Sequence, residues 1–113
     1  MITLWHNPRC SKSRQALALL EEAGAEVSVR LYLKNTADTK EIEQLQSALG
    51  IATLDMMRKG EKAFKDAGLG KDSSDADLRA AMQAHPILIE RPIAVKDGKA
   101  IIGRPPENVL SLL

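Results

Sequence analysis

The chain has 113 residues, which suits a single domain with one hydrophobic core. Its net charge is +1 with acidic and basic residues interspersed, so nothing in the charge indicates binding to nucleic acid or to an anionic membrane. There is no apolar segment long enough for a membrane span and no signal-peptide pattern at the start, and we expect a cytoplasmic protein. One cysteine cannot form an internal disulfide, and one Cys with two distant His residues excludes a zinc cluster.

The first third of the chain predicts a strand, a helix and a second strand. Residues 2–6 indicate a buried strand, and residues 11–23 carry apolar side chains at helical spacing. Residues 26–33 alternate clearly between two faces. The apolar face has Val27, Val29, Leu31 and Leu33, and the other face has Ser28, Arg30 and Tyr32. A strand–helix–strand unit of this length predicts parallel strands with a right-handed crossover.

The rest of the chain predicts a helical block and then a hairpin. Residues 38–84 show short helical patterns, one of which has Ser74 as its expected N-cap. Two apolar runs flank Asp97 and Gly98, which is a strong turn signal for antiparallel strands. The last residues predict a helix that begins near a proline. We therefore expect one α/β domain, residues 1–113, whose mixed four-stranded sheet is interrupted by a helical insertion at about 38–84.

The segment "HNPRCSKSR" places the single thiol between the first strand and the first helix. Pro8 disfavours a helix that starts earlier, so Cys10 is expected at or near the N-cap. The free N–H groups of Ser11, Lys12 and Ser13 then point toward the sulfur, and the helix dipole favours negative charge there. These effects lower the thiol pKa and create a cradle for an oxyanion. The alternative is a small, buried and inert cysteine.

Two neighbours of the thiol have open roles. His6 could supply a cation or a hydrogen bond, and Ser13 either satisfies backbone groups or bonds the Cys10 thiolate through its hydroxyl. Ser13 also stands where a C-x-x-C redox motif has its second cysteine. With no partner thiol in the chain, an adduct on Cys10 must be resolved from outside, by glutathione or a small redoxin.

Three arginines far from the thiol in sequence are candidate oxyanion ligands: Arg58, Arg91 and Arg104. Arg91 and Arg104 each precede a proline at an edge of the predicted hairpin. Guanidinium groups bind oxyanions through several planar donors, which favours arginine over lysine for this task. Each arginine, taken alone, is also compatible with solvation or pairing with acids such as Glu90 and Glu107.

Taken together, "HNPRCSKSR", "MMRKGE", "HPILIERPI" and "IGRPPE" resemble the glutaredoxin-coupled arsenate reductase family over essentially the whole chain, and most closely its short members with "PRCSKSR". The resemblance implies a thioredoxin-like fold in which Pro92 is a cis-proline facing the thiol. It implies that Cys10 attacks arsenate, that His6 and Ser13 lower the pKa of Cys10, and that Arg58, Arg91 and Arg104 bind the oxyanion. Glutathione then acts as co-substrate and glutaredoxin as partner, with no bound cofactor. Ser11 and Lys12 replace a Gly-Thr pair of better-characterised members.

Two other functions compete with this one. Spx-type regulators share the fold and bind RNA polymerase without enzymatic chemistry, but they usually carry the C-x-x-C switch that this chain lacks at Ser13. A monothiol redoxin acting on glutathione mixed disulfides would explain Cys10 and Pro92 but not three arginines. The arginines together favour the enzyme.

Overall fold

The computed structural model describes residues 1–113, which form two compact units. The first unit combines Met1–Asn35 with Arg91–Leu113, and the second is Thr36–Glu90. None of the helices has the length and hydrophobicity that a membrane crossing needs. The elements of the first unit are β1 (Ile2–Trp5), α1 (Ser11–Glu22), β2 (Val27–Arg30), β3 (Ile93–Lys96), β4 (Lys99–Ile102) and the 3₁₀ helix η3 (Pro106–Leu112).

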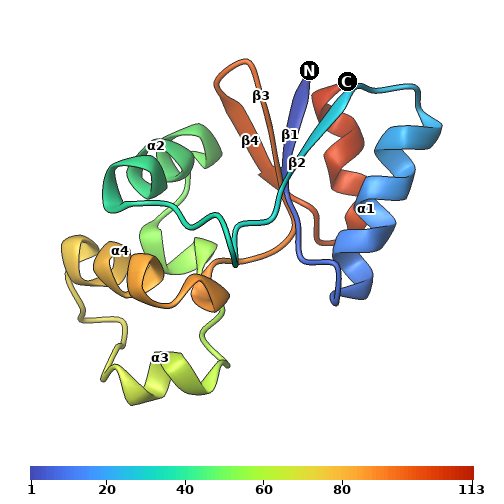
Figure 1. The fold of residues 1–113 in the computed structure, drawn as a ribbon. Coiled ribbons are helices and arrows are strands. Elements are labelled where there is room, and N and C mark those ends of the chain that lie inside the picture. Colours follow the sequence, from blue (N-terminus) through green and yellow to red (C-terminus); the bar gives the residue numbers. More distant parts are fainter. The chain divides into compact units, whose positions relative to one another are not determined.

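The first unit contains a four-stranded mixed sheet in the order β2-β1-β3-β4 (Figure 1). β1 runs parallel to β2 and antiparallel to β3, and β3 pairs antiparallel with β4. Asp97 and Gly98 have φ of 51° and 79°, the left-handed values that a tight two-residue hairpin turn requires. The predicted α/β fold, with its βαβ start and ββα end, is confirmed, although the last helix is 3₁₀ rather than α.

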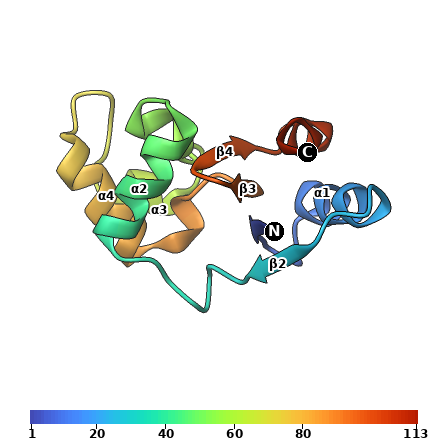
Figure 2. The ribbon, with the colours of Figure 1, turned by 90° about the horizontal axis from the view of Figure 1, so that it is seen from above.

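The hydrophobic core of this unit lies between the sheet and two helices, α1 and η3, which lie side by side (Figure 2). Its buried members come from both layers: Ile2, Leu4, Ala16, Leu20, Ala94 and Val109. Burial of each large aliphatic side chain contributes about 1.5–3 kcal/mol. The core therefore fixes α1 against β1, and with them the short loop that joins the two.

The second strand is shorter than its sequence pattern indicates. The alternation predicted a strand over 26–33, but β2 ends at Arg30. Beyond it Tyr32 is buried, at 1 % exposure, whereas Leu31 and Leu33 are each 38 % exposed. β2 is an edge strand, and Val29 within it is already 43 % exposed, so the face expected to be apolar is exposed from Val29 onward.

The second unit is helical, as predicted for residues 38–84. It contains α2 (Thr39–Leu49), η1 (Thr53–Met56), α3 (Lys62–Asp66), α4 (Asp75–Ala84) and η2 (Pro86–Leu88). The Ser74 hydroxyl accepts a hydrogen bond from the N–H of Asp77 at 3.1 Å, which confirms the expected N-cap. An isolated antiparallel bridge pairs Met57, after η1, with Ile89, near the end of the unit.

Candidate active site around Cys10

The loop between β1 and α1 folds into a tight turn that presents Cys10 at the start of the helix. The N–H of Cys10 donates to the carbonyl of Asn7 at 3.0 Å, and the N–H of Arg9 donates to Oδ1 of Asn7 at 3.0 Å. The Arg14 side chain stabilises the turn further, since its Nη1 donates a hydrogen bond to the carbonyl of Pro8 at 2.8 Å. Cys10 has the extended backbone of an N-cap residue, with φ −95° and ψ 122°. The sulfur therefore lies where α1 has unpaired N–H groups.

The surroundings of Cys10 lower the pKa of its thiol. Burial, with 9 % of the residue exposed, acts in the opposite direction and raises the pKa. The N–H of Ser13, the positive charge of Arg91, the N–H of Lys12 and a hydrogen bond from Arg91 together outweigh burial. The net direction is downward, so the thiolate is present at a lower pH than in an ordinary cysteine. This is the electrostatic arrangement predicted for the helix start.

Two of the three predicted arginines, Arg91 and Arg104, reach the sulfur within the first unit. Nη2 of Arg104 lies 3.9 Å from Sγ of Cys10, and Nε of the same guanidinium donates to the carbonyl of Arg91 at 2.8 Å. The peptide bond between Arg91 and Pro92 is cis, as the resemblance implies, and so is the bond between Arg104 and Pro105. The two arginines thus precede cis prolines at adjacent ends of the β3–β4 hairpin.

Gly103 holds these two ends together, and the sequence patterns did not identify it. Its N–H donates to the carbonyl of Pro92 at 2.8 Å. A Cβ at this position would lie 2.8 Å from Cγ of Pro92 and 3.0 Å from Cγ1 of Val109, which is closer than side-chain carbons pack. The signal that could have identified Gly103 in the sequence is its position directly before the candidate ligand Arg104. Only a residue without a side chain lets the ring of Pro92 and the side chain of Val109 approach this closely.

His6 and Ser13 form a buried pair beside the turn. Nδ1 of His6 lies 2.6 Å from Oγ of Ser13, which also accepts a hydrogen bond from the N–H of Asn7 at 3.0 Å. Burial, and then the charge of Arg14, lower the pKa of His6. Of the two roles left open for His6, the structure shows the hydrogen bond, and the lowered pKa disfavours the cation. The Ser13 hydroxyl bonds His6 and the N–H of Asn7 rather than the sulfur, and it is the backbone N–H of Ser13 that lowers the pKa of the thiol.

The remaining predicted residues lie at the helix start and in the second unit. Ser11 and Lys12 are the first two residues of α1, with exposed side chains. Arg58 belongs to the second unit, where its guanidinium pairs with Glu61 and lies 4.0 Å from Glu90. The N–H of Arg58 donates to the carbonyl of Leu88 at 2.7 Å. Pairing with acidic residues was the alternative to oxyanion binding that the sequence left open for Arg58.

The first unit therefore combines a nucleophile with an anion site. A thiolate at Cys10 can attack an electrophilic centre, while backbone N–H groups and guanidinium groups hold negative oxygens attached to that centre. Because the donors are fixed by the helix and by hairpin hydrogen bonds, they need little rearrangement as charge develops.

Comparison with known proteins agrees with this chemistry. The model of the ArsC family matches residues 5–112. An arsenate reductase of Neisseria meningitidis serogroup B is 45% identical over 114 residues, covering 99% of this chain and 97% of that protein. The solved structure of an arsenate reductase from Vibrio cholerae is 46% identical, with a TM-score of 0.96 and coverage of 99% of this chain and 97% of that one. The uncharacterized protein YfgD of Escherichia coli K12 is 46% identical, covering 99% of this chain and 96% of that protein. These likenesses confirm the thioredoxin-like fold, and the chain belongs to the ArsC family.

Proposed function

We propose that this chain is an arsenate reductase that uses Cys10 as its nucleophile. The single observation that carries the proposal is the lowered pKa of the Cys10 thiol beside the helix N–H groups, Arg91 and Arg104. Arsenate is a tetrahedral oxyanion with an electrophilic central atom, which matches a thiolate set among anion-binding donors. The arsenate reductases of Neisseria meningitidis and Vibrio cholerae support the choice of arsenate among oxyanions.

The first proposed step is attack of the Cys10 thiolate on arsenic(V). A sulfur–arsenic bond forms, and one arsenate oxygen leaves as water after it takes up protons. The N–H groups of Lys12 and Ser13 stabilise the thiolate before attack. Arg91 and Arg104 hold the remaining arsenate oxygens, and their positive charge offsets the negative charge on these oxygens. Ser11 completes the helix start that faces the oxyanion.

The second proposed step is resolution by an external thiol, because the chain has no second cysteine. Glutathione attacks the Cys10 sulfur, a disulfide bond forms, and the sulfur–arsenic electron pair leaves with arsenic, which becomes arsenic(III). Glutaredoxin then takes the glutathione group by thiol–disulfide exchange and releases the Cys10 thiolate. Two electrons from the thiols thus balance the two-electron reduction of arsenic.

His6 and Ser13 act on this chemistry through the shape of the loop. Their hydrogen bond and the bond from Asn7 to Ser13 fix the first turn of α1, whose N–H groups face the sulfur. Arg58 is proposed as a third oxyanion ligand from the family resemblance. Its ion pair with Glu61 would then have to yield to the substrate.

A coupled assay tests the proposed function. Purified protein, arsenate, glutathione, glutaredoxin and glutathione reductase are mixed, and NADPH oxidation is followed together with arsenite formation. We expect turnover that falls at least about a thousandfold in Cys10→Ser, because the nucleophile is lost. Circular dichroism of the variant controls for folding. Turnover no higher than in Cys10→Ser would reject arsenate as the substrate.

A further inference from the structure

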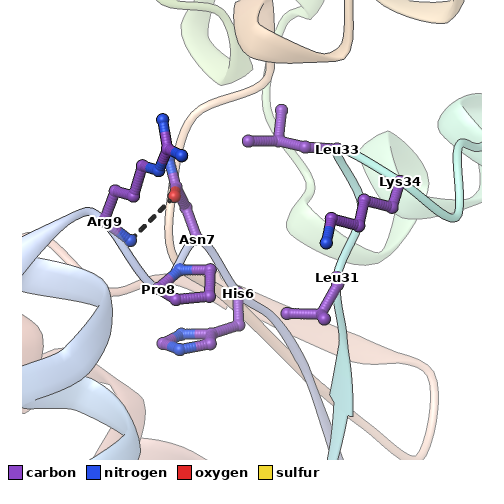
Figure 3. Close-up of a pocket in the computed structure, with 7 residues that line it drawn as sticks. All are labelled: His6, Asn7, Pro8, Arg9, Leu31, Leu33 and Lys34. Atoms are coloured by element: carbon purple, nitrogen blue, oxygen red, sulfur yellow. Dashed lines mark hydrogen bonds between the residues drawn. The ribbon is translucent and has the colours of Figure 1, made fainter.

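A recess lies beside the catalytic turn. Two of its residues, His6 and Asn7, also support the first turn of α1, but its other residues have no part in the proposed arsenate chemistry. It has a volume of about 260 Å³ and is walled by the loop residues His6, Asn7, Pro8 and Arg9 and by Leu31, Leu33 and Lys34 after β2. In Figure 3 the side chains of Leu31, Leu33 and Lys34 extend from the segment after β2 toward the loop. This volume is slightly below the roughly 300 Å³ at which sites for drug-sized molecules begin. The recess therefore suits a short peptide-like group.

The leucines of this recess lie in the turn that follows β2. The N–H groups of Lys34 and Asn35 both donate to the carbonyl of Leu31, at 3.0 and 2.8 Å, and this turn puts Tyr32 inward. Leu31 and Leu33 are left 38 % exposed. Two exposed leucines around a concave surface offer apolar contact to a ligand.

The two charged residues of the recess, Arg9 and Lys34, are both cations, and neither is paired with an acidic side chain. The side chains of Arg9 and Lys34 make no hydrogen bond and no ion pair in the structure, in which Arg9 bonds Asn7 only through its backbone N–H. No carboxylate lines the recess. An occupant with negative groups and an apolar stem therefore fits best.

We propose that this recess binds the resolving thiol, a small peptide thiol that carries carboxylate groups, as glutathione does. This inference rests on the proposed function. The ligand's carboxylates pair with Arg9 and Lys34, and its stem lies on Leu31 and Leu33. Arg9 is the residue before Cys10, so one wall of the recess belongs to the same turn that presents the nucleophile, although Cys10 itself does not line the recess. The bound thiol attacks the Cys10 sulfur as described above.

Thiol–disulfide exchange without arsenate tests the recess by itself. The Cys10 thiolate attacks glutathione disulfide, a mixed disulfide forms and one glutathione thiolate leaves. Its rate is measured by mass spectrometry for the wild type and for the double variant Arg9→Gln/Lys34→Gln. Bis(2-hydroxyethyl) disulfide, which has no charge, serves as the second probe and reports the reactivity of the sulfur alone.

We expect the double variant to react at least about tenfold more slowly with glutathione disulfide and within twofold of wild type with the neutral disulfide. Lys62→Gln/Lys65→Gln removes the same net charge from α3 and should leave both rates within twofold. An equal fall with both probes, an equal fall in the α3 control, or no fall at all would overturn the proposal.

The coupled assay separates this inference from the proposed function. If arsenate is reduced but Arg9→Gln/Lys34→Gln leaves the KM for glutathione unchanged, the recess is not the thiol site and the arsenate chemistry stands. If arsenate is not reduced but selectivity for glutathione disulfide depends on Arg9 and Lys34, arsenate reduction fails and the thiol site stands. The expected result is a KM for glutathione raised at least about fivefold, with the KM for arsenate unchanged.

Discussion

Two sets of basic side chains flank the Asn7–Cys10 turn, and they differ in how firmly they are held. Near the sulfur, Nε of Arg104 donates to the carbonyl of Arg91 at 2.8 Å, and Arg91 lowers the pKa of the thiol through its charge and a hydrogen bond. In the recess, the side chains of Arg9 and Lys34 are not bound to any protein group.

This difference matches two kinds of ligand. Donors fixed in advance stabilise charge that develops at one position, since they do not have to reorganise during the reaction. Unbound long side chains can follow a flexible ligand that arrives and leaves, at the cost of ordering them on binding. We therefore propose that Arg91 and Arg104 bind the arsenate oxygens, and that Arg9 and Lys34 bind the resolving thiol.

Removal of a fixed arginine should have the largest effect. We expect Arg91→Ala to lower kcat/KM for arsenate by about 10²–10³-fold, the loss typical of one preorganised donor to a developing charge. The pKa of Cys10 should also rise, because the charge and hydrogen bond of Arg91 lower it. Steady-state kinetics and the ultraviolet absorbance of the thiolate measure the two effects.

Arg91→Lys sharpens this prediction, since it keeps the charge but not the planar donors. It should recover part of the pKa shift and little of the arsenate turnover. The exposed Lys99→Ala, at the turn end of the same hairpin, is the control for loss of one positive charge away from the thiol. If Arg91→Ala has wild-type kinetics and an unchanged pKa of Cys10, Arg91 neither binds arsenate nor activates the thiol.

Gly103→Ala tests whether the hairpin ends position the arginines. The new Cβ would meet Pro92 at 2.8 Å and Val109 at 3.0 Å, so the chain must shift. We expect a stability loss of about 1–3 kcal/mol, typical of overpacking, and a rise in the pKa of Cys10. Urea unfolding and the pH dependence of thiolate absorbance give these values.

Gly70→Ala is the matched control, because no atom lies within 4 Å of its added Cβ and, like Gly103, it has no left-handed φ. It should leave the pKa of Cys10 unchanged. If Gly103→Ala loses stability but keeps the wild-type thiol pKa, Gly103 serves packing alone.

The sequence predicted much of the fold and part of the site. Local signals were sufficient where a pattern and its environment agree, as in the Asp97–Gly98 turn, the Ser74 cap and the helix start at Cys10. Juxtaposition of Arg104 with Cys10 depends on the sheet that places β3 beside β1, which no local pattern contains.

Other features were misjudged or missed for identifiable reasons. The alternation over 26–33 did not reveal where the edge strand ends, so the exposure of Leu31 and Leu33 was not expected. The neutral state of His6 depends on burial, and the role of Gly103 depends on an absent Cβ facing Pro92. Burial and close approach are properties of the packed chain.

His6 gives the smallest predicted effect, in the pH dependence of stability. Its folded pKa lies below the unfolded value of about 6.5, because burial and Arg14 disfavour the charged ring. Between these two pKa values the unfolded chain binds more protons, so stability falls as pH falls below about 6.5. Urea unfolding of wild type and His6→Gln should show a weaker pH dependence in the variant over this range. Identical slopes would contradict a buried, neutral His6.

The pH dependence of Cys10 alkylation tests the central claim most directly. Iodoacetamide labelling is measured across pH, with and without arsenate, and with Cys10→Ser as the blank. We predict a rate that titrates clearly below the ordinary cysteine pKa of about 8.5 and that arsenate slows by occupying the adjoining donors. A rate that titrates at 8.5 or above and is indifferent to arsenate would contradict both the activated thiolate and its oxyanion site.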